Sequence, residues 1–225
     1  IGTSVTRLDA VKKVTGTAQF ADDIQFTRPL YCAVKRSPYA HAKILKIDTS
    51  KAEALPGVRA VITGEAYAKR SGLYLEDKNF LAVGTAKFIG EGVAAVAAES
   101  EELAHEAAEL IEVEYEELPA VFDALDGMKK DAPLIHPDLH TYKVAPIFYP
   151  QKGTNISHHY HLVKGNTDEA FKNADYTFEN NFYIPHVHHV PIETHCCTAQ
   201  YTADGDLTIW AACQSPFAVR RALAE

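Results

Sequence analysis

The sequence predicts an α+β fold in two domains. Short runs rich in Val, Ile and Ala are separated by clusters of Pro, Gly, Asp and Ser, a pattern typical of strands joined by turns. Helical segments lie between these runs, and such mixed spacing is typical of an α+β domain. The length of 225 residues exceeds one ordinary domain and suits two domains of about 100 to 150 residues each. The first expected strands cover residues 30–34, 43–47, 58–62 and 93–98.

Two helices are expected among these strands. The first covers residues 49–55 and is stopped by Pro56 and Gly57. The second begins after Ser100, a favoured N-cap, and carries two glutamates in its first turn, where the helix dipole favours negative charge. One more strand is expected over residues 112–121. Four apolar side chains of the second helix fall on one face: Leu103, Ala107, Leu110 and Ile111.

The periodicity is lost between about residues 126 and 153, where four prolines and two glycines collect. This segment is interpreted as a surface linker that contains the domain boundary. After it we expect a short helix over residues 168–173, an alternating strand over 176–184 and a hairpin over 198–212. Asp204 and Gly205 form the favoured two-residue hairpin turn, because type I′ geometry needs positive φ at both positions.

Composition narrows the class of ligand and the compartment. The formal charge is −8 and no run of Lys and Arg occurs, which disfavours nucleic acid and anionic membranes as partners. A small molecule that is neutral, or that can bind to an acidic protein, fits this composition better. The chain shows no signal-peptide pattern and no apolar stretch of about 18 residues, so we expect a reduced, cytoplasmic protein. Cys196 and Cys197 are adjacent in an expected strand and point to opposite faces, so they are interpreted as small buried hydrophobes rather than a disulfide.

Two groups of histidines raise the possibility of a zinc site. Neither group has the CxxC or HxxxH spacing that places ligands on one face, and alternation along a strand would separate neighbours. Solvated or packed histidines are therefore expected, and no metal site is predicted. The groups are His158, His159 and His161, and His186, His188, His189 and His195.

Glu193 lies in an otherwise apolar segment, which favours a buried, hydrogen-bonded carboxylate acting as a structural strut over one in a site wall. Gly84, Gly90 and Gly92 resemble a phosphate-binding fingerprint only faintly. A strand is expected after the third glycine, where a dinucleotide site would need a helix, so a bulge or turn is the interpretation.

The junction between the expected hairpin and a final helix carries the clearest chemical signal. A strand end followed by a helix amino end offers unpaired N–H groups and the positive end of the helix dipole, where an electronegative ligand can bind. Gln214 would aim a donor at such a ligand, just before Ser215 and Pro216 open the helix. The chain begins without Met and stops a few residues into this helix, so we expect a piece of a longer polypeptide.

Several blocks of the sequence resemble, in the same order, the molybdopterin-binding subunit of the xanthine dehydrogenase and aldehyde oxidase family of molybdenum hydroxylases. The resemblance implies an α/β hammerhead domain over residues 1–133, a linker over 134–153, and the incomplete start of a molybdopterin-binding domain over 154–225. The blocks are RLDAVKKVTGTAQFADDI from Arg7, LYCAVKRSPYAHAKILKIDTSKAEALPGVRAVITGE from Leu30, IGEGVAAVAAESEELAHEAAELIEVEYEELPAVFD from Ile89, and the ETH and CQSP segments.

The resemblance also implies roles for single residues. Gln214 matches a glutamine that donates a hydrogen bond to an oxo ligand of molybdenum, with Cys213 where Thr is common. His189 and Glu193 fall on an H-x-x-x-E pattern of mainly structural effect, and Val187 departs from the Gln of many relatives. The catalytic glutamate and most pterin contacts belong to later parts of such subunits. No catalytic residue and no metal ligand is therefore expected in this chain, which alone should be inactive.

The implied reaction is oxidative hydroxylation of an aldehyde or an N-heteroaromatic substrate, with water as the oxygen source. Electrons would pass to [2Fe–2S] clusters and FAD on other domains or subunits. The expected partners are the remainder of the molybdenum subunit, an iron–sulfur subunit, an FAD subunit and a small-molecule substrate, in an oligomer. Two alternatives stay open: a non-catalytic docking or assembly module for the iron–sulfur or flavin subunits, and a His/Cys metal-binding protein.

Overall fold

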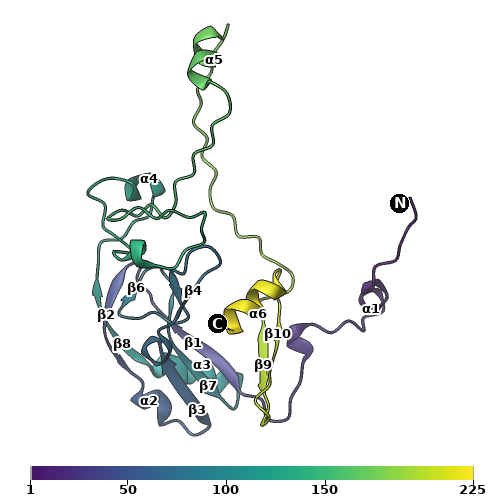
Figure 1. The fold of residues 1–225 in the computed structure, drawn as a ribbon. Coiled ribbons are helices and arrows are strands. Elements are labelled where there is room, and N and C mark those ends of the chain that lie inside the picture. Colours follow the sequence, from purple (N-terminus) through teal and green to yellow (C-terminus); the bar gives the residue numbers. More distant parts are fainter. Residues whose placement is uncertain (1, 225) are drawn as a thin grey trace. The chain divides into compact units, whose positions relative to one another are not determined.

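The computed structural model describes residues 2–224 and divides into two compact units. The core unit is Arg28–Asn173, and the terminal unit combines Ile1–Thr27 with Ala174–Glu225. Figure 1 shows the elements of both units, coloured along the chain. Strands and helices are mixed, which confirms the predicted α+β class. No helix of the described residues is long and apolar enough to cross a membrane.

The first sheet of the core unit has three antiparallel strands in the order β1-β7-β3. Val96 of the central strand lies opposite Ala33 on one side and Val61 on the other. The central strand is the most apolar of the three and is the most buried, as its position between two neighbours requires. These strands confirm three of the predicted ones to within two residues: β1 (Tyr31–Arg36), β3 (Val58–Thr63) and β7 (Gly92–Ala98).

The second sheet has the order β6-β2-β8 and is also antiparallel. Its central strand confirms the prediction over residues 43–47. The last strand stops at Glu117, earlier than the predicted residue 121, because Pro119 follows and has no N–H for a ladder. The bounds are β2 (Ala42–Asp48), β6 (Thr85–Ala86) and β8 (Glu112–Glu117).

Helix α3 (Glu101–Leu110) connects the two sheets and lies over β1 and β7 (Figure 1). Its N-cap is Ser100 as predicted, whose Oγ accepts the Leu103 N–H at 3.2 Å. The shorter α2 (Ser50–Glu53) contacts α3 and β3. The predicted face of α3 is right only in part, because Ala104 and Ala108 are also buried whereas Leu103 and Leu110 are only half-buried.

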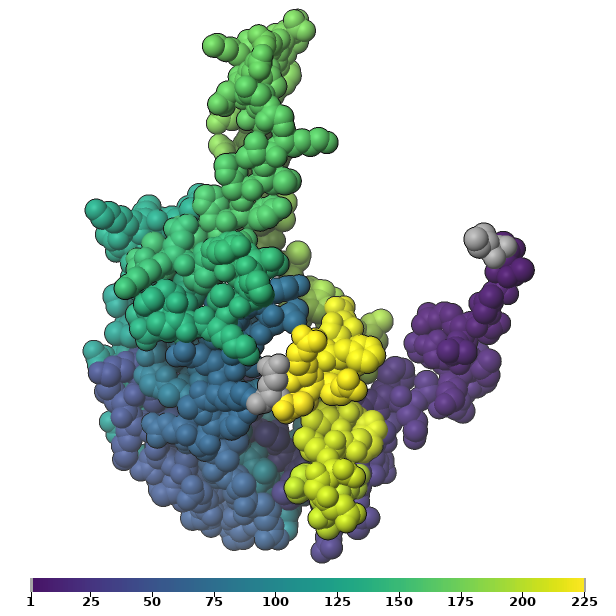
Figure 2. All heavy atoms as spheres, in the orientation of Figure 1, coloured from purple at the N-terminus to yellow at the C-terminus, as the bar shows by residue number. Residues whose placement is uncertain are grey.

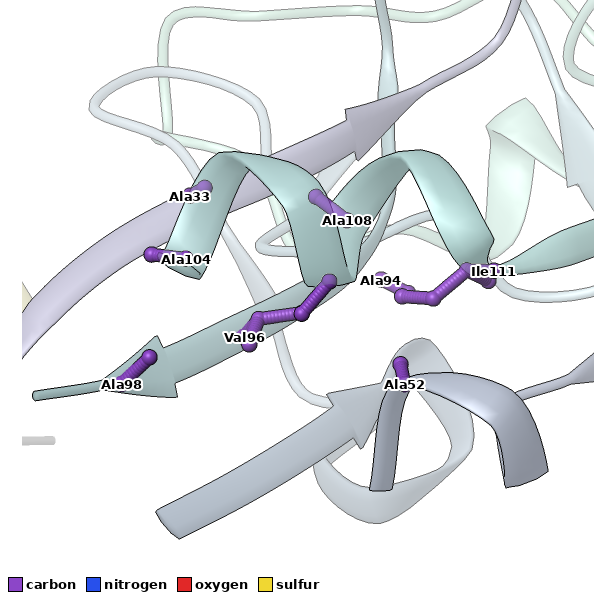
Figure 3. Close-up of a cluster of buried hydrophobic side chains, with 9 residues drawn as sticks. Ala33, Ala52, Ala94, Val96, Ala98, Ala104, Ala108 and Ile111 are labelled. Atoms are coloured by element: carbon purple, nitrogen blue, oxygen red, sulfur yellow. The ribbon is translucent and has the colours of Figure 1, made fainter. Parts of the chain in front are cut away.

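The core cluster consists mostly of alanines, which lets α3 approach the sheet closely (Figure 3). Ile111, just after α3, and Val96 of β7 are its largest fully buried members. The alanines of α3 and of the sheet are too short to move into a gap or out of the way of a larger side chain. The packing is therefore sensitive to added or removed methyl groups. The alanines are Ala33, Ala52, Ala94, Ala98, Ala104, Ala107 and Ala108.

The segment after β8 folds back onto an excursion between β3 and β6. Leu75 and Val144 form an antiparallel bridge, and the Glu76 N–H donates to the Lys143 carbonyl at 2.9 Å. Leu139 and Tyr142 of this segment are buried. The elements of the two segments are η2 (Gly64–Tyr67), β4 (Arg70–Ser71), β5 (Lys78–Asn79), α4 (Ala124–Gly127), η3 (Leu139–Thr141) and α5 (Thr167–Asn173).

The terminal unit is built on an antiparallel hairpin of β9 and β10, contacted by the 3-10 helix η1. The predicted strand over residues 176–184 is wrong: Phe178 and Phe182 are more than four-fifths exposed, and the segment is irregular. Alternation alone cannot make a strand without a partner for its backbone. The bounds are α1 (Ala10–Val14), η1 (Ala21–Asp23), β9 (Cys197–Tyr201), β10 (Leu207–Ala211) and α6 (Pro216–Ala224).

The hairpin is confirmed, but the two-residue turn predicted for it is wrong. Gly205 has φ of +91°, whereas Asp204 has no positive φ, so the type I′ requirement is not met. The Gly205 N–H donates to the Thr202 carbonyl at 3.0 Å, and the Thr202 N–H donates to the Asp206 carbonyl at 2.9 Å. The chain therefore turns through a three-residue loop with glycine in the left-handed position, a standard alternative to the two-residue turn.

Candidate functional site at the junction of β10 and α6

The junction has the strand-to-helix form that the sequence predicts. The hairpin ladder extends one residue past β10, because the Ala212 N–H donates to the Cys196 carbonyl at 3.1 Å. Helix α6 begins at Pro216, and its first helical bond joins the Val219 N–H to the Ser215 carbonyl at 3.0 Å. Proline suits the first helical position, since its N–H would be unpaired there in any case. The connection between ladder and helix is thus limited to residues 213–215.

Gln214 lies in this connection and is exposed. Within residues 2–224 its side-chain amide has no hydrogen-bond partner, so both of its N–H groups are available to a ligand. The amide sits immediately before a nine-residue helix, whose first-turn N–H groups and dipole favour negative charge. The donors of the amide and of the first helical turn thus lie next to one another in the sequence, and the role of Gln214 toward a cofactor stays a prediction.

A hollow of about 550 Å³ lies between β10 and α6, next to this connection. Figure 2 shows the hairpin and α6 at the molecular surface, in yellow-green and yellow. The apolar lining includes Leu207, Ile209, Val219 and Leu223, with Cys213 at the junction end. Sequence reasoning missed this lining, although Pro216, Val219 and Leu223 recur at the three- and four-residue spacing of a helix face.

Two contacts within the terminal unit hold the hairpin on η1 and the residues just after it. The rings of Phe26 and Trp210 lie 5.5 Å apart between centroids, and the Cys196 thiol donates to the Asp22 carboxylate at 3.6 Å. Partial burial, followed by the Asp22 carboxylate, raises the pKa of the Cys196 thiol. These contacts fix the strand that carries the chain into Gln214.

Cys196 and Cys197 are not the buried hydrophobes that the sequence predicts: Cys197 is exposed and Cys196 is half-buried. All four cysteines are free thiols, and Cys32 and Cys213 are exposed as well. The reason is that the terminal hairpin is covered by short segments rather than by a second layer. Alternation sends one side chain of each adjacent pair to the uncovered face.

The segment upstream of the hairpin is exposed and irregular. The prediction of a buried, hydrogen-bonded Glu193 is wrong, because its side chain is exposed and has no partner in the described chain. His189 stacks on His188 at 5.5 Å between ring centroids, and the His188 Nδ1 accepts the Val190 N–H at 3.3 Å. No three His, Cys, Asp or Glu side chains within residues 2–224 are grouped to hold a metal.

Two family models match the chain, one in its first half and one in its last third. Residues 15–119 match the a/b hammerhead domain of aldehyde oxidase and xanthine dehydrogenase, and residues 148–225 match the molybdopterin cofactor-binding domain. The nicotinate dehydrogenase large molybdopterin subunit of Eubacterium barkeri is 34% identical over 96% of this chain and 48% of its own length. The carbon monoxide dehydrogenase large chain of Hydrogenophaga pseudoflava is 34% identical over 92% of this chain and 26% of its own.

Solved structures agree with these matches. Quinoline 2-oxidoreductase from Pseudomonas putida 86 aligns with a TM-score of 0.81 at 32% identity, covering all of this chain and 28% of that one. CO dehydrogenase from Oligotropha carboxidovorans aligns with a TM-score of 0.81 at 31% identity, covering 99% of this chain and 28% of that one. The chain thus spans between about a quarter and a half of the length of these relatives.

The hammerhead match precedes the molybdopterin cofactor-binding match in the chain, which is the order that the resemblance implies. The chain therefore belongs to the large-subunit family of the xanthine dehydrogenases, aldehyde oxidases and CO dehydrogenases, and it carries the hammerhead domain of that family followed by part of the molybdopterin cofactor-binding domain.

Proposed function

We propose that this chain is part of the catalytic subunit of a molybdenum hydroxylase that oxidatively hydroxylates an aldehyde or an N-heteroaromatic substrate. The observation that carries the proposal is the ordered match to a hammerhead domain and a molybdopterin cofactor-binding domain over most of the chain. The family of oxidoreductases follows from these matches. The substrate and the oxygen source, which we take to be water, are inferences beyond them.

The names of the relatives support the N-heteroaromatic class first. One relative is a nicotinate dehydrogenase and one matching structure is a quinoline oxidoreductase, and both names refer to nitrogen-containing aromatic rings. A CO dehydrogenase large chain matches at the same identity as the nicotinate dehydrogenase. Carbon monoxide is therefore the second candidate substrate, one that the sequence alone does not suggest.

Gln214 is the residue through which we propose that this chain touches the cofactor. When bound, the molybdenum cofactor supplies the hydroxylation chemistry and takes up the electrons. The Gln214 amide would donate a hydrogen bond to it, beside the unpaired N–H groups of the first turn of α6. A neutral amide suits this task because it stabilises a changing charge without losing a proton of its own. The short connection between β10 and α6 limits how far the amide can move.

We also propose the partners that the reaction requires. Electrons would leave to [2Fe–2S] and FAD groups on other subunits or domains, and the remaining parts of the molybdenum subunit would complete the site. An oligomeric, cytoplasmic enzyme remains the prediction. The alternative function is a non-catalytic docking module for iron–sulfur or flavin subunits, which the well-packed core unit could serve by itself.

The function is tested on the assembled enzyme, purified with its partner subunits. Molybdenum and iron are measured first, and then oxidation of nicotinate, quinoline, an aldehyde and carbon monoxide is assayed in ¹⁸O-labelled water. Label in a hydroxylated aromatic or carboxylate product supports the proposal. Activity with carbon monoxide alone supports the second candidate, and a preparation that lacks molybdenum and oxidises none of these compounds favours the docking module.

The role of Gln214 is tested separately by Gln214→Ala in the same enzyme. We expect turnover to fall about 10²-fold, as when an oxyanion-hole donor is removed, with unchanged thermal stability because the side chain has no partner within the described residues. The matched control is Gln200→Ala, since Gln200 is an exposed glutamine of β9 in the same hairpin. Wild-type turnover in Gln214→Ala at full molybdenum content would disprove the contact.

A further inference from the structure

The core unit contains a cavity that is separate from the hollow between β10 and α6. Residues of the core unit form its entire lining. Its volume is about 670 Å³, within the range of about 300–1,000 Å³ that is typical of small-molecule sites. The walls come from the β4–β5 excursion, the β6 edge and the segment around η3. The proposed molybdenum chemistry uses none of these residues, so the cavity needs its own explanation.

Arg70 contributes a guanidinium that is held in place but not neutralised. The guanidinium carbon lies 4.2 Å from the centre of the Tyr142 ring, and Tyr142 is itself buried. The Tyr142 hydroxyl lies 3.1 Å from the Nδ1 of His136, which fixes the ring. In the part of the chain that the structure describes, no carboxylate or carbonyl bonds to Arg70. Stacking thus positions a planar fork of N–H donors that have no protein acceptor.

Lys87 contributes a second cation to the same cavity. Its backbone is fixed, because its N–H donates to the Oε2 of the buried Glu91 at 2.6 Å. Its ammonium group has no partner among residues 2–224. Burial first, and then the positive charge of Lys87, lower the pKa of His136, so the field of this cation extends to the residue that orients Tyr142.

The acidic groups of the lining do not balance these cations. Glu76 is paired with Lys143 at 2.8 Å, which leaves Asp138 as the one carboxylate of the lining without an ion pair in the described structure. The lining carries three cations, Arg70, Lys87 and Lys143, against two carboxylates, so it has one positive charge in excess in a chain whose formal charge is −8. This excess runs against the composition of the chain, in which Asp and Glu outnumber Lys and Arg.

We propose that this cavity binds a small organic anion, with its carboxylate or phosphate group held by Arg70 and Lys87. The guanidinium fork of Arg70 binds two oxygens of such a group. The Lys87 ammonium binds a third oxygen of a phosphate, or shares one of the two oxygens of a carboxylate, as a point charge. The Tyr142 ring backs the guanidinium, and His41, whose Nδ1 donates to the Pro119 carbonyl at 2.7 Å, lies in the same lining. The core unit thereby gains a ligand site formed jointly by residues of the hammerhead domain and by the segment around η3.

The experiment is isothermal titration of the assembled enzyme with citrate and with inorganic pyrophosphate, at constant ionic strength, with glycerol as the neutral probe. We expect saturable binding of at least one anion with a Kd of about 1 mM or below and no binding of glycerol. Preference for citrate would identify a carboxylate ligand, and preference for pyrophosphate a phosphate ligand. Absence of saturable binding by both anions would overturn the proposal.

Variants place the bound anion in the cavity. Lys87→Met should weaken binding about tenfold, since a charge-assisted hydrogen bond is lost, and Lys87→Arg should restore most of it. Lys130→Met is the matched control, because Lys130 is an exposed lysine of the same unit outside the lining and should bind as the wild type does. Circular dichroism verifies folding of each variant. Equal weakening by Lys87→Met and Lys130→Met would overturn the proposal, as would unchanged binding in Lys87→Met.

Discussion

Truncation of Ile111 to alanine tests the packing on which the core unit depends. Ile111 follows α3 directly and is 1% exposed, in a cluster otherwise made mostly of alanines. The change removes three buried carbon atoms at about 0.8 kcal/mol each, and the surrounding alanines cannot extend into the space that is left. Transfer and cavity costs together give a loss of about 3–4 kcal/mol in the free energy of unfolding. Ile111→Val removes one carbon and should cost about 1 kcal/mol.

The assay is urea unfolding of the purified chain, followed by far-UV circular dichroism and by tryptophan fluorescence. The single tryptophan, Trp210, lies in the terminal unit, whereas Ile111 lies in the core unit. The dichroism transition should therefore move to lower urea while the fluorescence transition keeps its midpoint. Trp210 acts as an internal reference for the unit that the substitution does not touch.

Ile89→Ala is the matched control, since it removes the same atoms from a side chain that is 66% exposed. We expect it to change stability by less than about 0.5 kcal/mol. A loss in Ile111→Ala no greater than in Ile89→Ala would refute the packing argument. A fluorescence midpoint that moves together with the dichroism midpoint would refute the assignment of Ile111 and Trp210 to separately unfolding units.

Two further predictions concern the core unit. Gly64→Ala should lower the free energy of unfolding of this unit by about 3 kcal/mol or more, as measured by urea unfolding. The added Cβ would lie 2.2 Å from the Ala82 carbonyl oxygen, and backbone cannot move aside as a side chain can. Gly127→Ala should cost less, because its Cβ would meet one side chain at 3.0 Å. Hydrogen bonds from Ser50 first, and then Lys46, lower the pKa of Asp48 from 3.8 to about 2. The stabilising effect of ionised Asp48 should therefore be complete above pH 3.8 and disappear as the pH falls through about 2. An NMR titration midpoint of Asp48 that stays near 2 in Ser50→Ala would contradict this cause.

The five longer strands of the core unit, β1, β2, β3, β7 and β8, are predictable because local pattern and tertiary environment agree there. The continuous apolar run of residues 93–98 predicts a strand, and β7 forms there with a neighbouring strand on each side. Ser100 predicts the start of α3, and its Oγ caps the helix. In both cases the residues that form the element also determine its burial or its cap, so a short stretch of sequence is enough to predict the element.

The errors occur where the decisive contact is distant in the sequence. Residues 176–184 alternate like a strand, yet the described chain offers them no neighbouring strand, and they remain irregular. Glu193 looks buried because its sequence neighbours are apolar, but those neighbours are exposed as well. The basic cavity could not be found from sequence because Arg70, Lys87 and Tyr142 are brought together only when the segment around η3 folds back.

The candidate site at Gln214 combines a predictable and an unpredictable part. The strand, the short connection and the proline-opened helix are local, and all were predicted. What holds them is not local, since an isolated two-stranded hairpin is marginally stable at best in water. The ring contact of Phe26 with Trp210 and the thiol contact of Cys196 with Asp22 join the hairpin to η1 and the residues after it, far back in the chain. The position of the Gln214 amide therefore depends on the contacts of Asp22 and Phe26 with the hairpin as well as on its own turn.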